Sequence, residues 1–305
     1  MFPIRRIKKD EEPVLKQNET DTADGGRLEY LTFPSLEETG IVKHLFTTRL
    51  GGVSEGELST MNLSFTRGDL ECRVAENYRR IGRVLGCRPE DMTASHQTHT
   101  TNIRQVTAAD KGKGITRLRD YENIDGLITD EPGIMLVTYF ADCVPLFFVD
   151  TVHRAVGLAH SGWRGTAAGM GGCMVKAMQE AYETKPEDLL VAIGPSICAD
   201  CYEVEEDTAR YFCELPQGGV MKGSKFSGVV RPGKQPGKYQ LDLWEANRQR
   251  LLAAGVKRER IAVADICTCC NADYLFSHRA SGGKRGNLGA FLELIQTEAS
   301  DGRTV

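Results

Sequence analysis

The chain has 305 residues, of which 41% are hydrophobic, and its formal net charge is −4. This length allows one large domain or two small ones, and the scattered charges form no basic face that would bind a nucleic-acid polymer. The charged N-terminus lacks a following apolar segment, and no apolar run approaches the roughly 20 residues of a membrane span. We therefore expect a cytoplasmic protein, with no membrane partner, whose ten cysteines stay reduced.

The N-terminal third predicts an extension followed by short strands and one clear helix. Residues 1–27 are charged and polar, which is typical of a peripheral extension to a single domain spanning 28–305. β-rich runs predict strands at 28–33 and 41–47. Apolar side chains that recur every three or four positions predict an amphipathic helix over 71–85: Val74, Tyr78, Ile81 and Leu85.

The segment 134–168 predicts the centre of the fold. It contains three apolar runs, at 134–141, 145–149 and 155–159, which are typical of strands buried on both faces. We expect Pro145 to interrupt continuous pairing, because proline cannot donate a ladder hydrogen bond. A glycine-containing turn then leads into a helix that we expect to run from residue 167 to about residue 183.

The C-terminal half predicts further strands and helices around one long loop. Apolar runs predict strands at 189–193, 261–266 and 288–295, and periodic segments predict helices at 206–213 and 241–254. Residues 215–238 are rich in glycine, proline and lysine, which indicates a long loop, mobile or lid-like.

Residues capable of chemistry stand at the ends of the central strands. Cys143 follows the first central run, and His160 ends the third. His96 and His99 precede another β-rich run, so we expect a strand there, with only one of the two side chains facing a given site. A catalytic zinc ion typically has three protein ligands and an open position for water. His99, Cys143 and His160 are the candidate set, and the metal would supply hydroxide at neutral pH.

Three other interpretations of these residues stay open. Cys198-x-x-Cys201 together with Cys267-x-Cys269-Cys270 could form a closed four-thiolate site, although buried reduced cysteines are the commoner case. Cys143 could be a nucleophile, with His160 or His99 as base and Asp142 nearby. Multicopper oxidation is the least favoured, because six scattered histidines offer few imidazole ligands.

Two arginines next to glycine turns are candidate anion ligands. Arg49 stands at a predicted strand end before Gly51 and Gly52, and Arg164 lies in the turn that leads into the predicted helix after His160. Ordinary surface ion pairs are the alternative role for both.

The order of these motifs resembles the laccase-domain family, also called polyphenol-oxidase-like, which includes the bacterial peptidoglycan editing factor. The match runs from about residue 40 to about 295. The matching motifs are Thr47-Thr48-Arg49-Leu50-Gly51-Gly52-Val53-Ser54, Asn62-Leu63, Glu76-Asn77, Gln97-Thr98-His99, Asp125-Gly126, Ala141-Asp142-Cys143, Ala159-His160-Ser161-Gly162-Trp163-Arg164-Gly165, Gly194-Pro195-Ser196-Ile197, Cys267-Thr268 and Phe276-Ser277-His278-Arg279.

The resemblance implies an α+β fold of α/β type, with mixed β-sheets packed together and flanked by helices, distantly like cysteine hydrolases. It implies a Zn²⁺ site at His99, Cys143 and His160, with copper as the less favoured metal. The implied activities are phosphorolysis of adenosine, inosine, guanosine and methylthioadenosine, and deamination of adenosine. Purine nucleosides and phosphate are thus the expected partners.

Four further residues complete the set of expected site residues. Asp142 is assigned a catalytic role, in which it orients a ligand or moves a proton, or else caps the turn. Arg49, Arg164 and Asn62 are assigned to substrate and phosphate. The alternative functions are a cysteine hydrolase or amidase that edits a peptidoglycan precursor, and a copper-dependent polyphenol oxidase.

Overall fold

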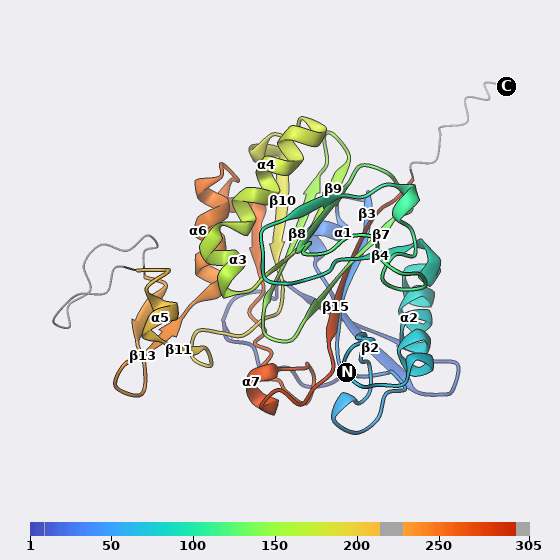
Figure 1. Cartoon of the computed structure of the whole chain (residues 1–305), viewed down its shortest axis with the longest axis horizontal. Coiled ribbons are helices and arrows are strands. Elements are labelled where there is room, and N and C mark those ends of the chain that lie inside the picture. The colour runs from blue at the N-terminus through green and yellow to red at the C-terminus, as the bar shows by residue number, and fades with distance from the viewer. Residues whose placement is uncertain (9, 214–227, 297–305) are drawn as a thin grey trace.

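Two six-stranded mixed β-sheets packed face to face form the centre of the molecule in the computed structural model, which describes residues 1–8, 10–213 and 228–296 (Figure 1). The first sheet has the strand order β1-β2-β3-β15-β7-β4, and only its β4–β7 pair is parallel. Its strands are β1 (Lys16–Asp21), β2 (Arg27–Thr32), β3 (Val42–Thr47), β4 (Met92–Ala94), β7 (Met135–Phe140) and β15 (Leu288–Leu294).

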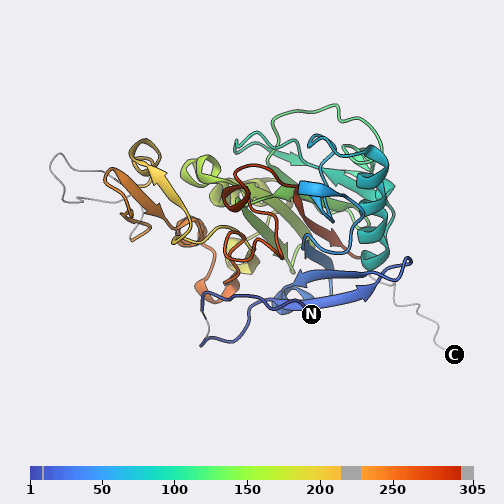
Figure 2. The same cartoon turned by 90° about the horizontal axis from the view of Figure 1, so that it is seen from below.

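The second sheet has the order β14-β10-β8-β9-β6-β5, with parallel pairs at both of its edges. Its strands are β5 (Ile103–Gln105), β6 (Gly126–Thr129), β8 (Val144–Asp150), β9 (Ala155–Ser161), β10 (Leu189–Ile193) and β14 (Ile261–Val263). A small antiparallel sheet of β11 (Glu203–Glu205), β13 (Lys238–Leu241) and β12 (Val230–Pro232) projects at one side, next to α5 (Glu206–Ala209) (Figure 2).

The inner faces of the two large sheets share one apolar core. Phe46, Phe140 and Leu292 from the first sheet pack in the same buried cluster as Phe147 and Leu158 from the second. β8 and β9, the strands that the most apolar runs form, are buried along their whole length. Burial on both faces explains why these runs show no polar alternation.

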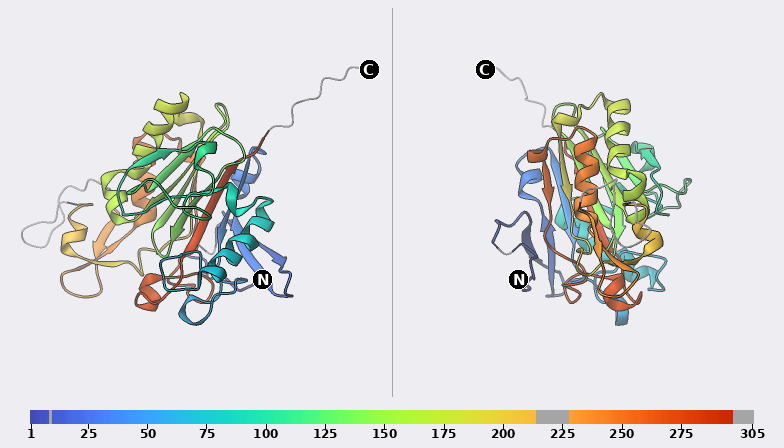
Figure 3. Two further views of the ribbon diagram at one scale, coloured as in Figure 1. Left: turned by 45° about the vertical axis from the view of Figure 1, so that its right-hand side comes forward. Right: turned by 90° about the vertical axis from the view of Figure 1, so that its left-hand side faces the viewer.

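Helices cover both outer faces, which gives four layers (Figure 3). On the first sheet, α2 (Glu71–Leu85) packs Val74, Tyr78 and Ile81 against the strands and ends at Gly86, whose φ is 68°. On the second sheet lie α4 (Met170–Tyr182) and α6 (Leu243–Ala253). The remaining short helices are α1 (Pro34–Glu37), α3 (Trp163–Ala168) and α7 (His278–Ser281). This arrangement confirms the predicted class of mixed sheets flanked by helices.

Several local predictions differ from the structure. Pro145 is the second residue of β8 and pairs in register with His160. Its carbonyl still accepts a hydrogen bond from the backbone N–H of Gly194 at 2.9 Å, so only the N–H contribution to the ladder is missing. His96 to Thr101 form a loop and not a strand. The helix predicted from 167 to 183 is broken at Gly169, whose φ of 89° separates α3 from α4.

The predicted peripheral regions are only partly irregular. Residues 16–21 of the N-terminal extension pair with β2 as an edge strand, and Phe2 stacks on Tyr274 with ring centroids 5.2 Å apart. Most of the predicted 215–238 loop lies outside the described residues, and the remainder contains β12 and the start of β13. Among the described residues, no helix combines the length and apolar character needed to cross a bilayer.

Candidate metal centre and adjoining cavity

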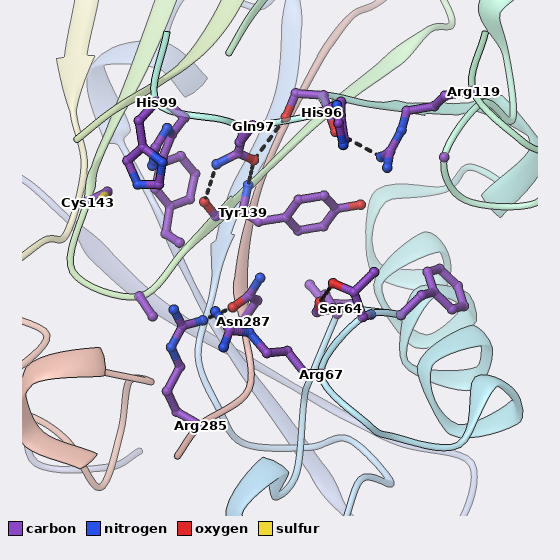
Figure 4. Close-up of a pocket in the computed structure, with 18 residues that line it drawn as sticks. Ser64, Arg67, His96, Gln97, His99, Arg119, Tyr139, Cys143, Arg285 and Asn287 are labelled. Carbon is purple, nitrogen blue, oxygen red and sulfur yellow. Dashed lines mark hydrogen bonds between the residues drawn. The ribbon is translucent and has the colours of Figure 1, made fainter. Parts of the chain in front are cut away.

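A cavity of about 390 Å³ opens where the C-terminal end of β7 meets the loop after β4 (Figure 4). Its volume is in the range of pockets that hold small ligands. The wall combines polar, aromatic and cationic side chains, among them Ser64, Phe65, Arg67, His96, Gln97, His99, Arg119, Tyr139, Phe140, Cys143, His160, Arg285 and Asn287.

Three of the lining residues form a compact group of metal-ligand type. The ligand atoms of His99, Cys143 and His160 all lie within 4.8 Å of one another. His99 comes from the loop after β4, Cys143 from the turn between β7 and β8, and His160 from β9. Two imidazoles and a thiolate suit a tetrahedral Zn²⁺ ion, whose fourth position would face the cavity. The sequence-predicted triad is therefore brought together by three segments that are distant in the chain.

Asp125 organises the group from behind. Its Oδ1 accepts a 2.7 Å hydrogen bond from Nδ1 of His160, which leaves the other ring nitrogen of His160 for a ligand. The same carboxylate accepts from the backbone N–H groups of Thr98, His99 and Thr100 at 2.9–3.1 Å. A carboxylate that orients a histidine and fixes the loop of a second one is the usual support of a metal-binding histidine.

The charges around Cys143 favour its thiolate. Burial opposes ionisation of the thiol, but His160 and His99 outweigh it and lower the pKa of Cys143 to about 6. For His160 the effects are reversed. Burial lowers its pKa, but Cys143 and Asp125 outweigh burial and raise the pKa to about 9. Thiolate is the form in which cysteine binds metals and attacks electrophiles.

The carboxylate of Asp142 is not part of the cavity lining. Its Oδ1 accepts from Thr268 Oγ1 at 2.6 Å, and its Oδ2 accepts from the backbone N–H of Arg279 at 2.7 Å. The residue has a φ of 95°, which few non-glycine residues adopt. Asp142 thus fixes the strained turn that presents Cys143.

The structure places Arg49 and Arg164 outside the wall of the cavity as the described residues form it. The guanidinium of Arg49 donates to the carbonyls of Ser59 and Ala272 at 3.0 and 2.8 Å and lies over Phe276. That of Arg164 lies over Trp163, 4.4 Å from the ring centroid.

Asn62 is buried beneath the cavity. Its Oδ1 accepts from the backbone N–H groups of Ser64 and Asn287, each at 3.0 Å, so that it positions two residues of the wall. Asn62 therefore acts on the site indirectly, by positioning Ser64 and Asn287.

Three other arginines give the cavity a positive wall. Arg67, Arg119 and Arg285 line it, and none of them forms an ion pair with a carboxylate in the described part of the chain. Burial and the nearby Arg67 lower the pKa of Arg285 to about 10, and its buried Nε has no hydrogen-bond partner among the described residues. Guanidinium groups without a carboxylate partner, one of which, that of Arg285, is also partly desolvated, are suited to an anionic ligand.

Only weak sequence signals point to these residues. Arg67 and Arg285 each adjoin a glycine turn, and Asp125 precedes Gly126, but turn composition does not reveal a shared cavity. Of the other histidines, His44 accepts from the backbone N–H of Phe33 and His153 bonds Asp150. Both of these imidazoles therefore have structural partners away from the triad.

The comparisons with known proteins agree on one family. Residues 43–296 match the family model described as "Multi-copper polyphenol oxidoreductase laccase". A relative from Geobacillus stearothermophilus named purine nucleoside phosphorylase YlmD is 40% identical over 250 residues, which cover 81% of this chain and 88% of the relative.

Solved structures give the same result. The crystal structure of YlmD from Geobacillus stearothermophilus superposes with a TM-score of 0.77 at 36% identity and covers 91% of this chain and 99% of that one. The Bacillus licheniformis hypothetical protein YfiH superposes with a TM-score of 0.79 at 34% identity, covering 87% and 96%. The model match and these relatives show that the chain is a member of the laccase-domain family.

Proposed function

We propose that the protein is a zinc-dependent purine nucleoside phosphorylase. It would cleave adenosine, inosine, guanosine and methylthioadenosine with inorganic phosphate, giving the free base and a pentose 1-phosphate, and would also deaminate adenosine to inosine. The observation that carries the proposal is the presence, in one cavity, of a three-ligand group and of arginines that have no ion-pair partner among the described residues. Relatives of this chain are named purine nucleoside phosphorylase, and these names support the substrate class.

The donor set fits a zinc ion better than a multicopper centre. His99, Cys143 and His160 would hold the ion, with Asp125 fixing the orientation of the His160 ring. When bound, zinc would supply Lewis acidity and activate water at neutral pH, as deamination requires. A cluster of several copper ions needs more imidazoles than the two that this group contains.

The cationic and aromatic walls suggest how the substrates bind. Arg67 and Arg285 would hold phosphate through charge-assisted hydrogen bonds and direct one of its oxygens towards C1′ of the pentose. Tyr139 and Phe140 offer apolar surface for a purine base. Holding both reactants in one cavity replaces a bimolecular encounter by a positioned one.

Replacing Arg285 with methionine is expected to raise the KM for phosphate by about tenfold to a hundredfold, since a hydrogen bond to a charged group contributes about 1.5–3 kcal/mol. The KM for the nucleoside should change little. Steady-state kinetics with phosphate and nucleoside varied separately measure both. Arg88→Met is the matched control, because Arg88 is exposed, pairs with Asp91 and lies outside the cavity wall. An equal rise in both KM values would argue against a phosphate role.

Replacing Gly162 with alanine is expected to weaken zinc binding by at least about tenfold, because metal ligands tolerate little displacement. A Cβ at this position would lie 3.0 Å from both Cys143 Sγ and His99 Cδ2. Competition with a zinc-binding dye measures the affinity. Gly172→Ala is the control, because its Cβ would meet only Ala254 at 3.9 Å. Unchanged affinity in the Gly162 variant would contradict the placement of the ligands.

A cysteine hydrolase is the second candidate, favoured by the sequence of contacts from Asp125 to His160 to Cys143. This order of acid, imidazole and thiolate is that of a catalytic triad. A metal chelator separates the two functions. It should inactivate the phosphorylase and leave a thiol hydrolase active, whereas a thiol reagent would inhibit either.

The proposed function is tested with a panel of nucleosides incubated with and without phosphate after zinc loading. We expect release of base and pentose 1-phosphate only when phosphate is present, and ammonia from adenosine in either condition. Absence of turnover on every nucleoside, with zinc bound and phosphate present, would contradict the proposal.

A further inference from the structure

A second group of four cysteines lies outside the cavity, in the loops that follow β10 and β14. The Sγ atoms of Cys198, Cys201, Cys267 and Cys270 are all within 4.8 Å of one another. None of them is among the residues that line the cavity. Cys198 and Cys267 are buried, whereas Cys201 and Cys270 are partly exposed.

The topology explains how two distant Cys-x-x-Cys pairs meet. β10 and β14 are parallel neighbours, so their C-terminal ends lie at the same edge of the second sheet. The pairing continues beyond the strands as a parallel bridge between Ser196 and Cys267. The two Cys-x-x-Cys turns therefore start next to one another at this sheet edge, and their sulfur atoms come together. The long interval between the pairs in sequence is therefore spanned by the fold itself.

We propose that these four cysteines bind a structural zinc ion, distinct from the ion assigned to His99, Cys143 and His160. Four thiolates around zinc, with Zn–S of about 2.3 Å, are about 3.8 Å apart. The Sγ atoms of Cys201 and Cys270 are 3.5 Å apart, which agrees with that spacing and is far longer than a disulfide bond of about 2.0 Å.

Two backbone donors and one guanidinium group lie next to the sulfur atoms. Backbone N–H groups of Cys198 and Cys270 donate to Cys267 Sγ at 3.2 and 3.4 Å. The guanidinium of Arg279 donates to the carbonyls of Cys201 and Glu203 at 3.0 and 2.9 Å, so a positive charge adjoins the Cys198–Cys201 pair. Amide donors and a nearby cation are the groups that favour thiolate over thiol.

The zinc ion would also fix the turn that presents Cys143. The backbone N–H of Ile197, next to Cys198, donates to the Asp142 carbonyl at 3.0 Å. The hydroxyl of Thr268, next to Cys267, donates to the Asp142 carboxylate at 2.6 Å. Both cysteine pairs are thus one residue away from a contact with Asp142. A zinc ion bound by the four thiolates would stabilise these two hydrogen bonds without taking part in the reaction.

The test counts and characterises the bound metal in the full chain. Native mass spectrometry of protein produced with zinc should give about two ions per chain, one for each four-coordinate site. The double variant Cys201→Ser and Cys270→Ser should retain about one ion, held by the other site. These two residues are chosen because they are partly exposed and tolerate a polar side chain. Cys173→Ser, on α4 and outside both groups, is the control that should lose no zinc.

The two sites are separated by a reciprocal variant. His99→Ala with His160→Ala should remove the ion of the cavity and leave an ion with four sulfur ligands, recognised by X-ray absorption at the zinc edge with Zn–S at about 2.3 Å. The measurement distinguishes failure of this proposal from failure of the proposed function, because each variant removes only one site. Retention of all zinc by the cysteine double variant, or disulfides among these four residues in peptide mapping under non-reducing conditions, would overturn the proposal.

Discussion

Replacing Cys143 with alanine is expected to lower kcat/KM for phosphorolysis by about 10³-fold or more and to abolish inosine formation, since the proposed metal would be lost with its ligand. The thiol is the sulfur donor of the triad, and its low pKa of about 6 arises from His160 and His99 against the effect of burial. Base release and ammonia release, measured separately, should therefore fall together.

The appropriate control is Cys173→Ala, which removes a partly buried thiol from α4 at a position outside both cysteine-containing groups. It should keep both activities and the full zinc content. If the Cys143 variant retained either activity at the full rate, the two reactions would not share the proposed site.

Replacing Asp125 with asparagine is expected to weaken zinc binding by about tenfold to a hundredfold, the usual cost of losing a carboxylate that supports a metal-binding histidine. The amide keeps the size of the side chain. However, it cannot supply the negative charge that His160 contacts at 2.7 Å, nor accept as strongly from the loop that carries His99. Zinc affinity and kcat at saturating zinc are the two measurements.

A second histidine–aspartate pair, in which the carboxylate is buried and the imidazole partly exposed, provides the control for this variant. Asp150 contacts Nδ1 of His153 at 2.9 Å and is fully buried, but it lies outside the cavity wall. Asp150→Asn should reduce thermal stability without changing zinc affinity. Similar zinc affinities in the Asp125 variant and the wild type would show that Asp125 has only a structural role.

The sequence predicted the central strands from strong local patterns, whereas the layered mixed fold was implied by the family resemblance, and the triad was one of several open interpretations of the same residues. The apolar runs that became β7, β8 and β9 are buried on both faces, so they contain almost no polar alternation. Cys143 and His160 stand at the ends of such runs, where a polar side chain must face a cavity or a partner. The helix over 71–85 was equally clear from its spacing.

Residues whose role depends on tertiary contact could not be predicted in the same way. Asp125 follows a loop and looks like a simple turn residue, yet its carboxylate supports two segments of the site. Arg285 and Arg67 are more than two hundred residues apart in the chain and meet only across the cavity. Conversely, the glycine turns next to Arg49 and Arg164 indicated anion binding, whereas their guanidinium groups contact carbonyls and aromatic rings.

The four-cysteine group shows a further limit of spacing arguments. An interval of 65 residues separates Cys201 from the next cysteine pair once Cys213 is set aside, which fits no local zinc motif. The parallel pairing of β10 with β14 brings the two cysteine pairs together in space despite this interval. A prediction of strand order would have been needed to recognise the site.

Anomalous diffraction at the zinc edge from crystals of the zinc-loaded protein tests the central claim most directly. We predict a peak enclosed by His99 Nε2 or Nδ1, Cys143 Sγ and His160 Nε2, open towards the cavity that contains Arg67 and Arg285. Zinc density elsewhere on the molecule and none among these three side chains would contradict the account.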